Sequence, residues 1–243
     1  MIGETRAGDV IFLDIETVPY IGSFDETPVA MRKLWDSKSK YFRNEEETPA
    51  MVWERAGIYA EFGKIICISA GIITGTSPRK LRLKSFYGDD ERQLLTEFSS
   101  MLTRFRPEKE VNLCAHNGRE FDFPYIARRM VIHRLPLPQI LNTAGRKPWE
   151  IRLLDTMDMW KFGDYKHFTS LDLLTNILGI ATPKDDLDGS MVAGTYWKDH
   201  DLRRIAVYCE KDVIAVAQVF LTFAGEPLIS PEDIESVTTF PAA

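Results

Sequence analysis

The predicted fold is built around one stretch, Val10-Ile11-Phe12-Leu13-Asp14-Ile15-Glu16-Thr17. Its first four residues are apolar without alternation, which predicts a strand buried on both faces. Asp14 and Glu16 are two positions apart, so their side chains point to one face, with Cα atoms roughly 6.5 Å apart. Such a pair needs protons or a cation, and hard divalent ions suit oxygen ligands. Strands also end in acidic residues that turn into solvent, so this pair alone establishes no site.

Length and composition favour one domain with a good-sized core. For the 243 residues we predict a single domain over 1–224, with an insertion at about 19–62 and a C-terminal tail over 225–243. The part of the insertion up to residue 50 is polar and charged, and its basic cluster is more typical of a solvated face than of a phosphate contact. A helix is expected over 49–62, between Pro49 and Gly63.

Charge, hydropathy and cysteine usage narrow the class of protein. The net charge of −6 argues against a protein that coats nucleic acid, but not against an enzyme that grips a few nucleotides. The absence of a long apolar run and of a signal-peptide pattern predicts a cytoplasmic protein without a membrane partner. Cys67, Cys114 and Cys209 lie in apolar stretches without metal-ligand spacing, and we expect reduced core residues.

The middle of the chain alternates strand and helix patterns. Residues 64–74 and 81–87 predict an antiparallel hairpin, and a helix with a periodic apolar face follows Asp89 or Asp90. A buried strand at 111–115 then runs into the Asn117-Gly118 turn. The order of these elements predicts an α/β fold.

Two further acids follow strands in this region. Asp122 lies where a strand has ended and a helix begins, a usual place for sites in α/β proteins, although an Asp there can also be a simple helix N-cap. Asp155 ends a short strand over 151–155, and either supports the site from behind or merely ends that strand. Neither acid identifies a site by itself.

The last long helix, from Asp199 or His200 to about Phe223, carries a carboxylate on its apolar stripe. Asp212 shares that stripe with residues such as Cys209 and Val213, and a core-facing carboxylate needs a neutralising partner. Tyr208 is four residues earlier on the same face, so its hydroxyl can reach whatever Asp212 holds.

Three segments together resemble the motifs of the DEDD superfamily of 3′-to-5′ exonucleases, in its tyrosine type: Phe12–Thr17, Asn117–Asp122 and Tyr208–Asp212. The middle segment is most similar to the proofreading domain of family B DNA polymerases, and the chain resembles the stand-alone predicted exonucleases related to it. The resemblance spans about 10–223. It implies a ribonuclease H-like α/β fold, with a five-stranded mixed central sheet flanked by helices.

The resemblance implies a metal-dependent enzyme that hydrolyses single-stranded nucleic acid, DNA favoured, from its 3′ end to mononucleotides. Two divalent ions, Mg²⁺ or Mn²⁺, about 3.5–4 Å apart would activate the attacking water and stabilise the leaving oxygen. The metal ligands implied are four carboxylates, with Tyr208 orienting the water because a tyrosine pKa near 10 makes it a poor base. These carboxylates are Asp14, Glu16, Asp122 and Asp212.

Residues implied to bind substrate are less specific. Thr17, Asn117 and Phe121 match positions that contact the terminal nucleotide, although Phe121 is also compatible with a core residue. Lys184 matches a lysine that steadies the scissile phosphate, but a surface lysine is the more ordinary interpretation. Nearby arginines, Arg129 among them, can line a groove or simply occupy a helix surface.

Two alternatives remain open at this point. The same site can cleave RNA, so trimming of RNA 3′ ends competes with a role in DNA repair. A catalytically inactive nucleic-acid-binding scaffold is the alternative from another class, and all four carboxylates are present against it. The chain has no room for polymerase domains, so proofreading or processivity would need a protein partner in trans.

Overall fold

The structure is a computed structural model, and it describes residues 5–105, 110–164, 168–181 and 187–240. Its centre is a mixed sheet of six strands in the order β5-β4-β1-β2-β3-β6. β1 pairs antiparallel with β2 and parallel with β4, so it lies inside the sheet. The strands are β1 (Val10–Pro19), β2 (Gly63–Thr74), β3 (Lys80–Tyr87), β4 (Asn112–Ala115), β5 (Leu153–Asp155) and β6 (Ile234–Ser236).

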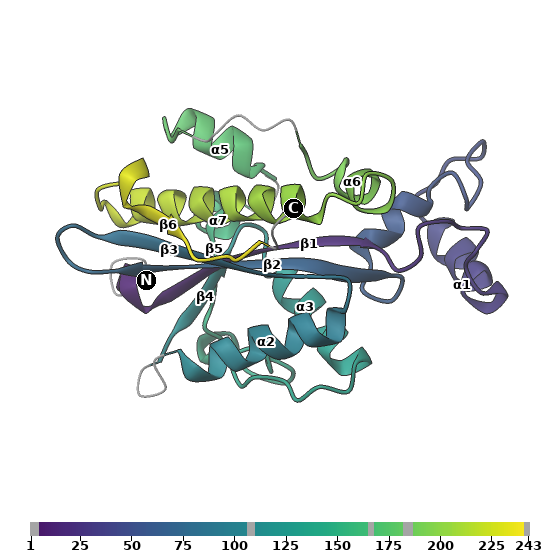
Figure 1. The fold of residues 1–243 in the computed structure, drawn as a ribbon, viewed down its shortest axis with the longest axis horizontal. Helices are drawn as coiled ribbons and strands as arrows, with labels where there is room; N and C mark the ends of the chain where they lie inside the picture. The colour runs from purple at the N-terminus through teal and green to yellow at the C-terminus, as the bar shows by residue number, and fades with distance from the viewer. Residues whose placement is uncertain (1–4, 106–109, 165–167, 182–186, 241–243) are drawn as a thin grey trace.

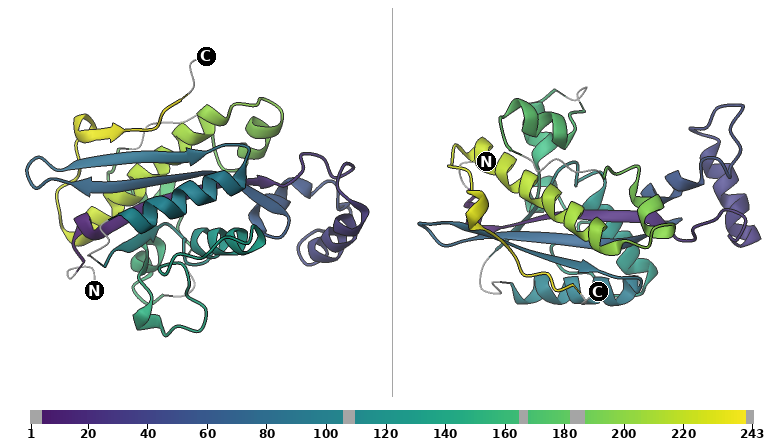
Figure 2. Two further views of the ribbon diagram at one scale, coloured as in Figure 1. Left: turned by 60° about the horizontal axis from the view of Figure 1, so that its bottom comes forward. Right: turned by 45° about the horizontal axis from the view of Figure 1, so that its top comes forward.

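Helices cover both faces of this sheet (Figure 1). The second and third helices lie on one face and the fifth to seventh on the other, whereas α1 projects from one end of the molecule (Figures 1 and 2). The helices are α1 (Val29–Ser39), α2 (Glu91–Arg104), α3 (Asp122–Ile132), α4 (Thr156–Lys161), α5 (Leu171–Ile177), α6 (Val192–Trp197) and α7 (Leu202–Ala224). No helix in the described ranges is long and apolar enough to cross a membrane.

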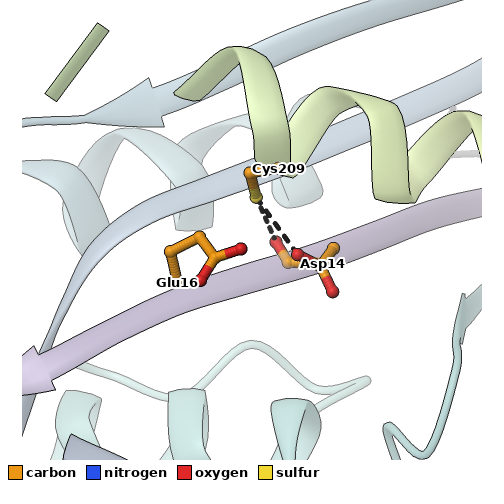
Figure 3. Close-up of side chains that lie close together, drawn as sticks. All are labelled: Asp14, Glu16 and Cys209. Atoms are coloured by element: carbon orange, nitrogen blue, oxygen red, sulfur yellow. Dashed lines mark hydrogen bonds between the residues drawn. The ribbon is translucent and has the colours of Figure 1, made fainter. Parts of the chain in front are cut away.

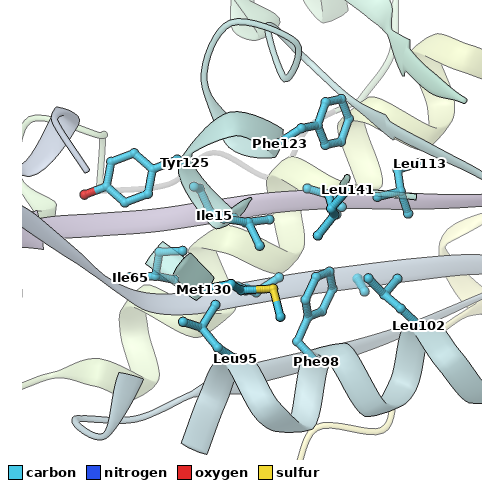
Figure 4. Packing of buried hydrophobic residues seen from close by; sticks show 14 of the residues in the cluster. Ile15, Ile65, Leu95, Phe98, Leu102, Leu113, Phe123, Tyr125, Met130 and Leu141 are labelled. Atoms are coloured by element: carbon cyan, nitrogen blue, oxygen red, sulfur yellow. The ribbon is translucent and has the colours of Figure 1, made fainter. Parts of the chain in front are cut away.

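The alternation of side chains along β1 divides the core into two halves. Ile11, Leu13 and Ile15 pack in the cluster formed with α2 and α3 (Figure 4). Val10 and Phe12 pack in the cluster that contains the apolar residues of α7. Because strand side chains alternate with a period of two, Asp14 and Glu16 continue the face of Val10 and Phe12, under α7.

The predicted α/β class is confirmed, but the predicted five-stranded sheet was one strand short. The sixth strand, β6, comes from the tail and pairs in parallel with β3. It has three residues, of which two are exposed, so it carries no apolar pattern that sequence analysis could detect. The division into one domain, an insertion and a tail stays a prediction.

The insertion forms a small core of its own. Trp35 of α1 is fully buried among other aromatic rings, including those of Trp53 and Phe62. The helix predicted over 49–62 was wrong, because only a 3-10 helix forms, over Trp53–Ile58. Gly57 within it lies against the backbone of Val18, so this segment follows the packing against β1 and not a regular helical pattern.

Candidate active site

Asp14 and Glu16 of β1 meet Cys209 of α7 at the centre of the candidate site (Figure 3). Each offers one ligand atom, and these three atoms lie within 4.8 Å of one another. The Cys209 thiol donates to the Asp14 carboxylate Oδ2 at 3.3 Å and to its carbonyl oxygen at 3.4 Å. The helix thus contacts the strand directly at the first carboxylate.

Asp122, at the start of α3, interacts electrostatically with Asp14 and Glu16. It is the first helical residue and the N-cap is Phe121, so the alternative in which Asp122 is the N-cap was wrong. Phe123 N–H binds the Gly118 carbonyl at 2.9 Å, so the turn that begins at Asn117 leads directly into the helix. The Asp122 Oδ1 atom is buried and has no hydrogen-bond partner among the described residues.

The carboxylates of this group raise one another's pKa values. Burial raises the pKa of Asp14 well above its ordinary range, and the negative charges of Asp212, Glu16 and Asp122 add to the rise. Burial and the charges of Asp212 and Asp122 act in the same direction on the pKa of Glu16. Burial also raises the pKa of Asp122 to about 7. The site is therefore a set of interacting carboxylates whose ionised forms are unfavourable without added positive charge.

Three of these carboxylates have no cationic partner in the described ranges. None of the ion pairs in the described ranges includes Asp14, Glu16 or Asp122. Carboxylate oxygens that repel one another fit a hard divalent cation, and one of them, Asp122 Oδ1, is buried without a hydrogen-bond partner among the residues that the structure describes. The donor set is thus suited to magnesium or manganese.

Tyr208 lies one helical turn before Asp212 and hydrogen-bonds to its side chain. Burial, followed by the charges of Asp212, Glu16 and Asp14, raises the pKa of Tyr208 above its ordinary range. The hydroxyl therefore stays protonated at neutral pH and can donate a hydrogen bond, but it cannot act as a base there.

Asp155 supports the turn that carries Asn117. Its carboxylate accepts from the Asn117 N–H at 2.9 Å and the Arg119 N–H at 3.0 Å, and it also caps α4. Asn117 has a positive φ of 59°, a conformation that asparagine tolerates. Its Oδ1 atom is buried and has no hydrogen-bond partner in the described part of the chain. Asp155 therefore holds a turn that presents a second unsatisfied oxygen.

The other residues predicted to bind substrate differ in how far they are buried and in what they contact. Thr17 is half-buried, directly follows the irregularity in the pairing of β1 with β2, and hydrogen-bonds to Tyr125. Phe121 is half-buried and packs on the main core, with its ring centroid 5.4 Å from that of Tyr125. Lys184 lies outside the described residues. Arg129, one of the candidate groove arginines, is instead buried against Glu91.

Sequence analysis placed Cys209 in the core and missed its contact with Asp14. The residue is fully buried, as expected, and its thiol is free. Its spacing of three residues from Asp212 was the signal that placed both on one helix face. That spacing could have identified it as a neighbour of the acidic group.

Comparisons with known proteins identify the family and the fold of the chain. A family model described as "Predicted 3'-5' exonuclease related to the exonuclease domain of PolB" matches residues 58–227. The matched range includes Asp122, Tyr208 and Asp212, whereas Asp14 and Glu16 precede it. No curated protein matches the sequence.

Among solved structures, 94 chains match. One is the family B DNA polymerase from the hyperthermophilic archaeon Pyrobaculum calidifontis, with a TM-score of 0.51 and 16% sequence identity. The match covers 87% of this chain and 24% of the polymerase chain, so this chain spans about a quarter of that protein. At this identity the likeness shows the fold alone, and it confirms the ribonuclease H-like arrangement expected from the sequence.

Proposed function

The chain belongs to the family of predicted 3′-5′ exonucleases related to the exonuclease domain of PolB, and on that premise we propose the reaction and the residues that carry it out. The chain hydrolyses single-stranded nucleic acid from the 3′ end to mononucleotides, with DNA as the favoured substrate and two divalent cations as cofactors. The observation that supports this proposal most is the group of mutually repelling carboxylates around Asp14, of which Glu16 and Asp122 are buried.

The residues that would hold the cations are the four acids Asp14, Glu16, Asp122 and Asp212. Glu16 and Asp122 are buried and Asp14 and Asp212 half-buried, and carboxylate oxygens in such surroundings suit Mg²⁺ or Mn²⁺. The Asp122 Oδ1 atom, which has no hydrogen-bond partner among the described residues, is free to bind a cation or its water. When bound, the cations would supply a strong nucleophile at neutral pH and stabilise charge on the leaving oxygen.

The remaining side chains would position the reactants. Tyr208 stays protonated, so its hydroxyl can donate a hydrogen bond that orients the attacking water. The Cys209 thiol holds the Asp14 carboxylate in place through its hydrogen bond. Asn117 offers a buried side-chain oxygen on a turn fixed by Asp155, a suitable acceptor for a hydroxyl of the terminal nucleotide. Thr17, Phe121 and Lys184 remain proposed substrate contacts.

Choice of substrate depends on how side chains meet the 2′-hydroxyl of a ribose. Trimming of RNA 3′ ends is therefore tested beside DNA cleavage, and the faster substrate separates a role in DNA repair from RNA trimming. Proofreading in trans would add a partner protein, which the same assay can include.

The experiment is a time course on 5′-labelled single-stranded DNA and RNA of one sequence, with Mg²⁺ or Mn²⁺. The wild type should give a ladder that shortens from the 3′ end, and Asp212→Asn should give none. Asp172→Asn, an exposed acid in the first turn of α5, is the matched control and should cleave like the wild type. Metal binding without nucleotide release from either strand would refute the exonuclease assignment and favour the inactive scaffold.

A further inference from the structure

Glu210 follows Cys209 in α7 but faces a different part of the molecule. The residue is only 7% exposed, and its carboxylate Oε1 accepts three hydroxyl hydrogen bonds. The donors are Ser85 of β3 at 3.1 Å, Ser236 of β6 at 2.9 Å, and Thr238 just beyond β6. A buried carboxylate thus joins the middle of α7 to the C-terminal tail.

Two of the three hydroxyls are also held by backbone groups. Thr238 Oγ1 accepts from the Ser85 N–H at 2.8 Å, and Ser236 Oγ accepts from the Thr238 N–H at 3.2 Å. Each of these two hydroxyls therefore donates its proton to Glu210 while its oxygen accepts from the backbone. Such a satisfied network is rigid, because movement of the helix would leave a buried carboxylate without its hydrogen bonds.

The network also reaches the strand beside the candidate site. Ser85 Oγ lies 2.7 Å from Ser69 Oγ, and Ser69 is the residue of β2 directly opposite Asp14. Paired residues of neighbouring strands share a face, so Asp14, Ser69 and Ser85 form a polar row across the sheet under α7. Glu210 holds one end of this row, while Cys209 contacts the other.

We propose that Glu210 is a positioning residue: its hydroxyl contacts with β3 and the C-terminal tail fix the turn of α7 that carries Tyr208 and Asp212 over β1. This inference rests on the proposed exonuclease function. It assigns a role in that function to tail residues that lie beyond the family match at residue 227. Loss of the contacts should allow this turn of α7 to shift relative to Asp14. Such a shift lowers the rate at which bound substrate is cleaved more than it weakens the binding of substrate.

The test compares variants that break the contacts from either side. Glu210→Ala removes the acceptor, and the double variant Ser236→Ala/Thr238→Val removes two donors and leaves Glu210 in place. Glu210→Gln keeps a carbonyl oxygen that can accept the same bonds. Tyr87→Phe is the matched control, since it loses only the bond from the Tyr87 hydroxyl to the Thr239 carbonyl.

Rates on single-stranded DNA should be measured well below each variant's Tm. We expect kcat to fall about tenfold in Glu210→Ala and in the double variant with KM within about twofold, as loss of about 1.4 kcal/mol of positioning would give. Glu210→Gln should stay within about threefold, and Tyr87→Phe should match the wild type. If Glu210→Ala fails to fold, the double variant carries the test.

Two kinetic results would overturn the proposal. One is an unchanged kcat in the double variant, even if its Tm falls, since Glu210 would then be a structural anchor only. The other is a Glu210→Gln variant as slow as Glu210→Ala, since the charge and not the contacts would then matter. If the wild type cleaves nothing, the proposed function fails, and hydrogen exchange of residues 205–213 then tests the positioning role of the contacts on its own. Faster exchange in the double variant than in Tyr87→Phe would support that role. Equal exchange in the two variants would refute it.

Discussion

Glu91 and Asp122 are almost equally buried, at 4% and 3% exposed, but their carboxylates have opposite surroundings. Arg129 binds Glu91 through two nitrogens, at 2.8 and 2.5 Å, and His133 Nε2 lies 2.7 Å away. The Ile65 N–H also donates to Glu91, at 2.8 Å. This carboxylate therefore joins α2, α3 and β2 as a compensated ion pair.

Asp122 has no cationic partner among the ion pairs of the described ranges. Its carboxylate accepts backbone hydrogen bonds from its own N–H and that of Ile15, but it lies near the negative charges of Asp155 and Asp212, and its Oδ1 atom has no partner in the described ranges. The contrast shows that burial of an acid does not by itself indicate a functional site. A paired buried acid holds the fold together, whereas an uncompensated group leaves a requirement that an external cation can meet.

The substitution with the largest expected effect is Asp212→Asn, which changes the acidic group and should lower the rate of cleavage. The neutral side chain relieves buried repulsion but binds metal poorly, so we expect cleavage to fall by about a thousandfold or more with the fold retained. Cleavage rates and the circular dichroism spectrum measure both. Near-normal cleavage by this variant would contradict the assignment of the site.

The second prediction compares stability. Glu91→Ala leaves Arg129 buried without its partner and should destabilise the protein by about 3–5 kcal/mol. Asp14→Asn removes one of several repelling charges, so the metal-free protein should be as stable as the wild type or more stable. Urea unfolding in EDTA measures both. Glu97→Ala, on the exposed face of α2, is the control and should change little.

Equal losses of stability in Glu91→Ala and Asp14→Asn would contradict the claim that Glu91 stabilises the fold whereas Asp14 belongs to a group of repelling acids.

Sequence patterns were sufficient for the central parts of this arrangement. The unbroken apolar run predicted β1. Helical spacing placed Cys209 and Asp212 on one stripe of α7. The contact of Cys209 with Asp14 confirms this placement for Cys209. The pattern could not show that Arg129 pairs with Glu91, because the partner lies 38 residues away and an arginine on a helix is usually exposed. Short α4, α6 and β6 have too few residues for a periodic signal.

A third prediction concerns pH. The folded-state pKa of Asp122 is raised to about 7 from an ordinary value of 3.8, so the protonated form stabilises the fold. That contribution is complete below about pH 4 and is lost as the pH rises through about 7. Asp14 and Glu16 shift in the same direction. The metal-free protein should therefore be less stable at pH 8 than at pH 5.5, by a few kcal/mol at about 1.4 kcal/mol per pKa unit.

Thermal unfolding in EDTA at the two pH values measures this difference. Addition of Mn²⁺ at pH 8 should restore the lost stability, because the cation binds the ionised carboxylates. A Tm that rises from pH 5.5 to 8 without metal would contradict the proposed source of the repulsion.

The smallest expected effect is that of Tyr208→Phe. The variant loses one hydrogen bond to Asp212 and to the water that the hydroxyl orients, so cleavage should fall by about 10- to 100-fold and remain measurable. Single-turnover rates on DNA measure the loss. A variant as inactive as Asp212→Asn would assign more than water orientation to the hydroxyl.

The most direct test of the uncompensated acidic group is a titration of the metal-free protein with Mn²⁺, followed by electron paramagnetic resonance. We predict two bound Mn²⁺ ions per wild-type chain, weakened binding in Asp14→Asn, and wild-type binding in Glu97→Ala. Absence of saturable Mn²⁺ binding to the wild type, or equal binding by Asp14→Asn, would contradict the account.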